Sequence, residues 1–184
     1  IEIFKEISNK KGMGYSLGNI GVIYWNKGDY ENALEYYIRS LEISEELGDK
    51  DGIGASLNNI GGIYLKKGEY KKAASNLEQS LSIQREIGKK NILLETTTYL
   101  FLAYKMLGKE YDENEIYILN KETEIIEFEL NYHLYLLLEK FLYLKTAYNQ
   151  VQEKASSLEP EIKVQFLNYF IPKVILEEWD KANQ

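Results

Sequence analysis

Apolar side chains in the first half of the chain recur at the spacing of helices that bury one face. With about 100° of rotation per residue, Leu17, Ile20 and Tyr24 fall on one stripe of a helix. Ala33 and Tyr37 begin a similar stripe in the segment that follows. Since two such stripes must be buried, the pattern predicts two antiparallel helices that face one another.

The same pattern returns after 40 residues. Residues 12–33, GMGYSLGNIGVIYWNKGDYENA, align without gaps with residues 52–73, GIGASLNNIGGIYLKKGEYKKA. Over units 11–50 and 51–90, 19 of 40 positions are identical. A unit of this size cannot bury its apolar faces alone, so repeat 1 (residues 11–50) and repeat 2 (residues 51–90) are expected to stack on each other.

Glycines occupy matching places in both units. Gly21 and Gly61 leave no side chain where the two helices of a unit would approach most closely. Other glycines are placed to end helices in the left-handed conformation, and Asp49 is placed to cap the helix after one of them. These turn glycines are Gly28, Gly48, Gly68 and Gly88.

Each unit resembles the tetratricopeptide repeat (TPR), a helix–turn–helix of about 34 residues with the pattern W-x2-L-G-x2-Y, then A-x3-F, then P. The first unit reads Leu17-x2-Ile20-Gly21-x2-Tyr24 and then Ala33-x3-Tyr37, and the second reads Leu57-x2-Ile60-Gly61-x2-Tyr64 and then Ala73-x3-Leu77. The longer period and the missing Pro are similar to the long-period variety of kinesin light chains, polarity scaffolds and microbial signalling proteins. The resemblance implies an all-α fold, a right-handed superhelical solenoid of antiparallel helix pairs with a C-terminal helical cap.

The remaining segments depart from the repeat. Residues 91–126 are a degenerate repeat 3, in which Phe101 replaces the close-packing glycine, so its two helices are expected to splay apart. Residues 127–184 are predicted to form a helical C-terminal region and cap. Residues 1–10 align with residues 41–50, the end of a second helix and its loop, and we interpret them as the end of a truncated preceding repeat. Beyond residue 110, helices are expected at about 112–124, 128–138 and 141–156, with short closing helices starting near Pro160 and Pro172.

Composition excludes several classes of function. The 184 residues include 22 basic and 29 acidic side chains, and the resulting net charge of −7 argues against nucleic acid as the main partner. Because the chain has no cysteine, thiolate metal sites and thiol nucleophiles are excluded. No apolar run approaches the roughly 20 residues that cross a bilayer. We therefore predict no membrane partner and no cofactor, and we place the chain in the cytoplasm.

In a stacked array, the first helices of successive units line the concave face, and residues opposite their buried stripes would meet a partner. In repeat 1 these residues are Tyr15, Gly18, Asn19, Val22, Trp25 and Asn26. In repeat 2 they are Ala55, Asn58, Asn59, Gly62, Leu65 and Lys66. In repeat 3 they are Glu95, Thr98, Tyr99, Leu102, Lys105 and Met106. A channel of amides, aromatic rings and lysines predicts a protein or peptide ligand.

Two amides stand in the same register of consecutive units. Asn19 and Asn59 can each donate to and accept from the backbone of an extended peptide. In the long-period relatives, asparagines at this place bind the main chain of the ligand, and the resemblance carries to both positions but fails at Tyr99. The alternative is that these amides satisfy helix backbone groups or face water. Trp25 and Tyr15 would anchor an apolar ligand side chain or, alternatively, pack between repeats.

No catalytic or metal site is predicted. His133 lies in a largely apolar stretch with no assignable nucleophile or carboxylate partner, which favours a packed or interfacial histidine. The acidic residues at 110–115 lack the glycine turn and ligand spacing of a calcium loop. The clamp that chaperone-binding TPRs use for a terminal carboxylate is matched only by Asn59, so acidic chaperone tails are not expected to bind.

The sequence therefore favours a protein-interaction scaffold that holds a peptide or partner segment in its groove and has no catalysis of its own. One alternative is a regulatory TPR segment of a larger signalling enzyme. Residues 147–155 and 166–179 look similar to the tails of repeat regions attached to microbial nucleotide cyclases and kinases. A third hypothesis is self-association through the exposed N-terminal repeat edge.

Overall fold

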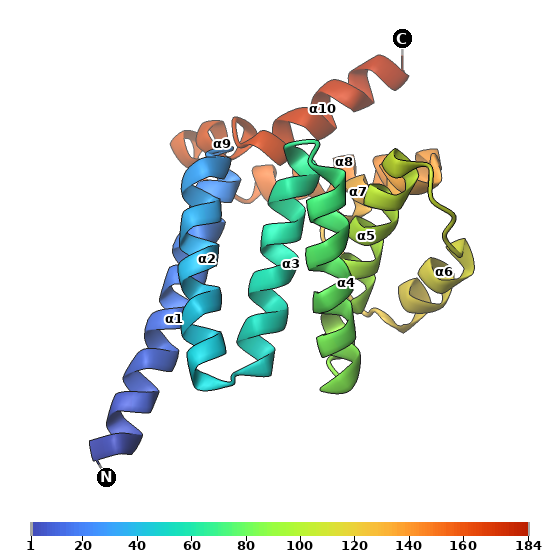
Figure 1. Ribbon diagram of the computed structural model, residues 1–184. Coiled ribbons are helices and arrows are strands. Elements are labelled where there is room, and N and C mark those ends of the chain that lie inside the picture. Colours follow the sequence, from blue (N-terminus) through green and yellow to red (C-terminus); the bar gives the residue numbers. More distant parts are fainter. Residues whose placement is uncertain (1, 184) are drawn as a thin grey trace.

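The computed structural model describes the backbone of residues 2–183, and it describes the side chains of residues 9–183 except residue 91. Within this part the fold is all-α, without a strand, and the first four helices lie side by side (Figure 1). The helices are α1 (Glu2–Asn26), α2 (Tyr30–Leu47), α3 (Lys50–Lys66), α4 (Tyr70–Glu86), η1 (Lys90–Ile92), α5 (Leu93–Leu107), α6 (Glu113–Glu122), α7 (Phe128–Leu138), α8 (Phe141–Ser156), α9 (Pro160–Leu167) and α10 (Phe170–Ala182).

The helices α1 to α4 form two antiparallel pairs, α1 with α2 and α3 with α4, and α2 packs on α3. The glycine of each close approach is required sterically. A Cβ atom added to Gly61 would lie 2.5 Å from Leu77 Cγ, and one added to Gly21 would lie 2.5 Å from Tyr37 Cε1. These distances are far inside van der Waals contact, so the predicted role of both glycines is confirmed.

The two pairs also share their internal hydrogen bonds and their turns. The hydroxyl of Ser40 donates to the carbonyl oxygen of Gly14 at 2.9 Å, and that of Ser80 donates to Gly54 at 2.6 Å. Glycines end the helices or form the turns with positive φ, between 64° and 75°. These glycines are Gly28, Gly48, Gly68, Gly88 and, in the third unit, Gly108. Repeats 1 and 2 therefore fold alike, as their sequence identity predicts.

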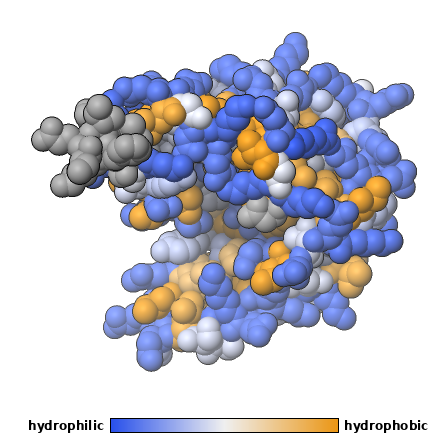
Figure 2. Space-filling model, turned by 90° about the horizontal axis from the view of Figure 1, so that it is seen from below, coloured by the Kyte–Doolittle hydropathy of each residue, from blue (hydrophilic) through white to orange (hydrophobic). Residues whose placement is uncertain are grey.

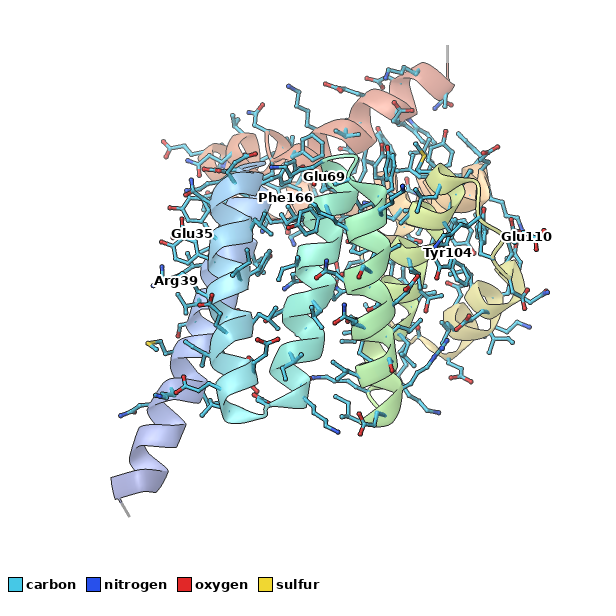
Figure 3. The ribbon with its side chains drawn as sticks, viewed as in Figure 1. Glu35, Arg39, Glu69, Tyr104, Glu110 and Phe166 are labelled. Carbon is cyan, nitrogen blue, oxygen red and sulfur yellow. The ribbon has the colours of Figure 1, made fainter. Side chains whose placement is uncertain are left out.

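The outer face of the array is solvated. Glu35 and Arg39 project from α2 away from α3, with their charged atoms 3.8 Å apart (Figure 3). An exposed pair of this kind stabilises a helix by only about 0.3–0.5 kcal/mol. The apolar residues are instead buried between the helices, in one cluster around Tyr37 and Ile63 and a larger one around Leu77 and Phe101.

In the third unit, α6 stands apart from α5, and α5 packs mainly on α4 and α7. The ring of Phe101 fills the space beside α5, with its centroid 6.2 Å from that of Tyr104 and 5.2 Å from that of Tyr111. A ring in place of glycine cannot admit a closely packed helix. The expected splaying of this unit is therefore confirmed.

The C-terminal region forms helices at the expected places. Helices α7 and α8 occupy the predicted ranges, α9 begins at Pro160, and Pro172 lies in the first turn of α10. The region packs on α5, and it also folds back across the ends of the repeats (Figure 1). There the ring of Phe170 meets that of Tyr30 edge to face, with centroids 5.9 Å apart. The return to the first repeat was not predicted, since residues so distant in sequence leave no local pattern.

Two expectations near the turns are wrong. The alignment of residues 1–10 with 41–50 predicts a loop at residues 8–10, but α1 continues through this segment from Glu2. Ser8 stands where repeat 1 has Gly48, and a serine does not readily adopt the left-handed conformation that ends α2. Asp49 precedes α3 without a side-chain capping bond, because its carboxylate pairs with Lys11 Nζ at 3.1 Å.

Candidate functional site

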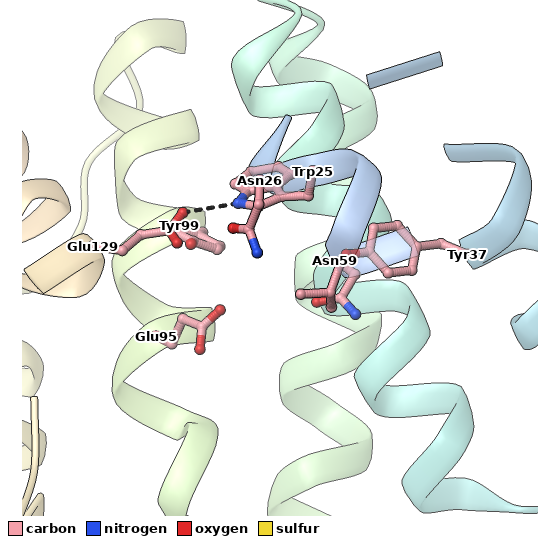
Figure 4. Close-up of a pocket in the computed structure, with 9 residues that line it drawn as sticks. Trp25, Asn26, Tyr37, Asn59, Glu95, Tyr99 and Glu129 are labelled. Carbon is pink, nitrogen blue, oxygen red and sulfur yellow. Dashed lines mark hydrogen bonds between the residues drawn. The ribbon is translucent and has the colours of Figure 1, made fainter. Parts of the chain in front are cut away.

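A cavity of about 150 Å³ opens on the concave face, where α1, α3, α5 and α7 come together (Figure 4). Seen from below, the molecule is hollowed between its two sides (Figure 2). The residues that line the cavity are Val22, Trp25, Asn26, Tyr37, Asn59, Gly62, Glu95, Tyr99 and Glu129. Three helices come from successive repeats and the fourth comes from the C-terminal region.

The cavity brings together seven of the residues that the sequence predicts on the concave face, Gly62 and Glu95 among them. Val22, Trp25 and Asn26 lie on one face of α1, while Asn59 belongs to α3 and Tyr99 to α5. They meet because their helices stack in the same orientation and present equivalent faces.

The amides in this wall are free. Among the residues that the structure describes, neither Asn26 nor Asn59 has a hydrogen-bonding partner, and Asn26 is exposed. Asn19 is exposed as well, but it lies outside the cavity. The proposed ladder of Asn19 and Asn59 therefore stays a prediction, with only its second member at the cavity.

Two carboxylates project into the cavity from the neighbouring helices α5 and α7, Glu95 from α5 and Glu129 from α7 (Figure 4). Trp25 Nε1 donates to Glu129 Oε1 at 3.1 Å, and Asn58 Nδ2 donates to Glu95 Oε1 at 3.1 Å. Burial raises the pKa of Glu129 to about 7, against the attraction of Lys66 and with added repulsion from Glu95. Burial also raises the pKa of Glu95. The cavity is thus an acidic environment in which neither carboxylate is fully solvated.

A buried polar network fixes the position of Glu95. Asn58 is only 5% exposed, and its Oδ1 accepts from the hydroxyl of Thr96 at 2.8 Å. The hydroxyl oxygen of Thr96 accepts from Gln84 Nε2 at 2.8 Å, and that amide also donates to Ser80 at 2.7 Å. The prediction that Asn58 faces a partner is therefore wrong: its amide orients Glu95 from behind.

The C-terminal region contacts the side chain of Lys66, another residue predicted to meet a partner. Lys66 Nζ lies 2.9 Å from His133 Nε2, and burial lowers the pKa of Lys66 to about 8. His133 is buried, its pKa lies well below the usual value because of that burial, and its ring stands edge-on to Tyr99 at 4.8 Å. The predicted packed histidine is confirmed, and Lys66 is not available to a partner.

Five further predicted residues do not line the cavity. Leu65 and Leu102 pack in the largest apolar cluster. Lys105 Nζ binds the carbonyl oxygens of Leu136 and Leu137, at 3.2 and 3.1 Å, and so caps the end of α7. Tyr15 and Met106 are exposed, at 47% and 56%, but they lie away from the cavity. For Leu65, Leu102 and Lys105 the predicted contact with a partner is wrong, because the chain itself takes up their side chains.

Two lining residues were absent from the predicted concave face. Tyr37 belongs to α2 and reaches the cavity past Gly21, whose missing side chain makes room for the ring. Glu129 belongs to α7, 104 positions along the chain from its partner Trp25. The glycine pattern could have indicated Tyr37, but no local signal marks Glu129.

Of the comparisons with known proteins, a family model matches part of the chain. A search of curated proteins found no match to the chain. No helix in the part that the structure describes has both the length and the apolar character needed to traverse a bilayer. A family model described as "Tetratricopeptide repeat" matches residues 13–86, the segment that contains the second half of α1 and all of α2, α3 and α4. Together with the two matching helix pairs, this match identifies residues 13–86 as tetratricopeptide repeats.

Proposed function

We propose that the chain is a binding module that holds a segment of a partner polypeptide in its concave groove, at the cavity between α1, α3, α5 and α7. TPRs generally mediate protein–protein interactions. The proposal assigns no catalysis to the chain itself. The observation that carries it is the cavity wall, in which Trp25 stands beside the unpartnered amides of Asn26 and Asn59.

The wall offers the two kinds of contact that an extended peptide needs. Asn26 and Asn59 can donate to and accept from its main chain. Trp25 and Val22 supply apolar surface for a side chain, and Val22 is 42% exposed. Since the helices hold these groups in place before binding, little conformational entropy is lost on association.

The C-terminal region narrows the site without filling it. It covers the face at Lys66 and Lys105, the two lysines that would have attracted an acidic ligand. The groove near the cavity is left with two carboxylates. This arrangement supports the prediction that acidic chaperone tails do not bind.

A peptide array followed by fluorescence-polarisation titration of the positive peptides tests the proposal. The wild-type chain is compared with an Asn26→Ala/Asn59→Ala double variant, in which two main-chain contacts are removed. At about 1 kcal/mol for each hydrogen bond, binding is expected to weaken roughly 30-fold. Asn19→Ala is expected to have a smaller effect, since Asn19 lies outside the cavity.

Asn76→Ala is the matched control, because the amide of Asn76 donates to Lys72 within its own helix α4. It should bind like the wild type. An array without positive peptides, or peptides that the double variant retains with unchanged affinity, would contradict the proposal.

Self-association through the N-terminal edge and the cytoplasmic location remain predictions. The edge includes residues 1–8, whose side chains lie outside the described part. Light scattering over a range of protein concentrations tests self-association, which would raise the measured mass.

A further inference from the structure

The cavity has more negative than positive charge around it. Glu95 and Glu129 line it, and each uses one carboxylate oxygen in a hydrogen bond with a neutral side chain. Within the described part of the chain, neither has an ion-pair partner within 4.0 Å. The nearby cation Lys66 attracts Glu129 but is directed to the ring of His133. Partly buried carboxylates without a counter-ion are unfavourable, so this cavity is suited to a cation.

The position of Glu95 is built into the fold. Asn58 holds one oxygen of its carboxylate, and Thr96, Gln84 and Ser80 hold Asn58 in turn. The chain of hydrogen bonds runs through three helices, and all four of these supporting side chains are buried. A carboxylate fixed in this way loses little freedom when it binds a ligand.

The walls and the size of the cavity select one kind of cation. Trp25, Tyr37 and Tyr99 supply aromatic surface, which attracts an organic cation through the face of the ring. The volume of about 150 Å³ matches that of an engineered cavity that binds one benzene molecule. It accepts a single side chain and is smaller than the pockets of drug-sized ligands, which begin at about 300 Å³.

We propose that this cavity binds one basic side chain of the partner segment, the ammonium of a lysine or the guanidinium of an arginine. The inference rests on the proposed function and adds its specificity. The basic group lies between Glu95 and Glu129 with its aliphatic stem against Trp25, while Asn26 and Asn59 contact the adjoining main chain. An apolar side chain in the same place would leave both carboxylates desolvated and unpaired, and an acidic one would add repulsion.

Small mimics of the two side chains test the inference without knowledge of the partner. The probes are n-butylammonium and n-butylguanidinium chloride, and the neutral control of similar size is N-butylurea, all titrated at constant ionic strength. The readout is the indole N–H signal of Trp25 in the 1H–15N spectrum of the whole chain. The protein has only two tryptophans, so a Trp179→Phe variant assigns the signal.

The expected result is a saturable shift of the Trp25 signal with one or both cations, half-complete at roughly 1–10 mM, as expected for a ligand of a few heavy atoms. N-butylurea should cause no saturable shift. Glu95→Gln should weaken the cation at least tenfold, since Gln keeps the hydrogen bond from Asn58 but removes the charge. Glu42→Gln on the exposed side of α2 is the matched control and should leave binding unchanged.

A shift with N-butylurea as large as with the cations, no saturable shift with either cation, or unchanged binding in Glu95→Gln would each overturn the inference. The comparison of charged and neutral probes on the wild type decides the question even if a variant does not fold. The array separates the two proposals. Peptides that bind without a basic residue and are weakened by the asparagine substitutions would contradict this inference alone, whereas an array without positive peptides would contradict the proposed function.

Discussion

The helix pair α3–α4 and the unit formed by α5 and α6 occupy consecutive places in the same array but pack differently. In the pair α3–α4, Gly61 lets Leu77 lie directly against the backbone of α3. In the third unit, the equivalent position is Phe101, and α6 stands apart. At this one position, the glycine of α3 allows a closely packed helix pair, whereas the phenylalanine of α5 goes with an open one.

The open unit matters for the site. Because α6 does not pair closely with α5, the chain continues and places α7 against α5. Helix α7 brings Glu129 to Trp25 and His133 to Lys66. The first helices of the three units thus supply three walls of the cavity, and the C-terminal region supplies the fourth.

The largest expected effect comes from removing the ring that characterises the open unit. Phe101→Ala should lower the free energy of unfolding by about 3–5 kcal/mol, because Phe101 is 6% exposed and no neighbouring helix is placed to fill the space. Urea unfolding followed by circular dichroism measures the change. A loss below about 1 kcal/mol would mean that α5 and α6 can close into an ordinary pair.

The second prediction concerns the helix that completes the cavity. Glu129 faces Lys66, Glu95 and Trp25, and the pKa of its carboxyl is about 7 in the folded chain against an ordinary value of 4.5. Below pH 4.5 the group is protonated in both the folded and the unfolded state and has no effect. As the pH rises toward 7, the unfolded state releases this proton first, so the wild type loses stability that Glu129→Gln does not lose.

Between pH 5 and pH 8, Glu129→Gln should therefore gain about 2 kcal/mol relative to the wild type. Urea unfolding of both proteins at the two pH values measures the difference. Glu42→Gln, which is exposed, serves as the control and should show no such gain. Equal pH dependence in the wild type and Glu129→Gln would place the carboxylate in water, and α7 away from the groove.

The third prediction tests the closed pair itself. Gly61→Ala should destabilise the fold by about 1–3 kcal/mol, since the new methyl group overlaps the buried Leu77. Gly12→Ala is the matched control in α1, where nothing lies within 4 Å of the new atom. It should be neutral or stabilising by up to about 1 kcal/mol. Equal effects at the two positions would contradict close packing at Gly61.

The smallest effect distinguishes the starts of α2 and α3. The carboxylate of Asp29 accepts a hydrogen bond from the backbone N–H of Asn32, whereas Asp49 makes no capping bond. Asp29→Ala should thus cost about 1 kcal/mol, and Asp49→Ala less, since Lys11, the ion-pair partner of Asp49, is 46% exposed. Thermal unfolding compares the two variants, and a larger loss for Asp49→Ala would be inconsistent with this difference.

Local patterns were sufficient to predict the repeats. The helix faces, the glycines of close approach and the turns all follow from residues within one 40-residue unit, and the same reasoning placed Trp25, Asn26 and Asn59 on the concave face. Reasoning from local patterns failed where a side chain contacts a residue that is distant in sequence. Asn58 looks like its neighbour Asn59 in sequence, but only the positions of Thr96 and Glu95 decide that it is buried. Lys66 and Lys105 contact residues of α7 instead of a partner. The position of α7 at the groove depends on long-range contacts that no short-range spacing in the sequence indicates.

The crystal structure of the chain in complex with the tightest-binding peptide from the array tests the central claim most directly. The peptide should lie between α1, α3, α5 and α7, with its main chain at Asn26 and Asn59 and a lysine or arginine side chain between Glu95 and Glu129. A peptide bound on the outer face of α2 and α4, with the cavity empty, would contradict the account.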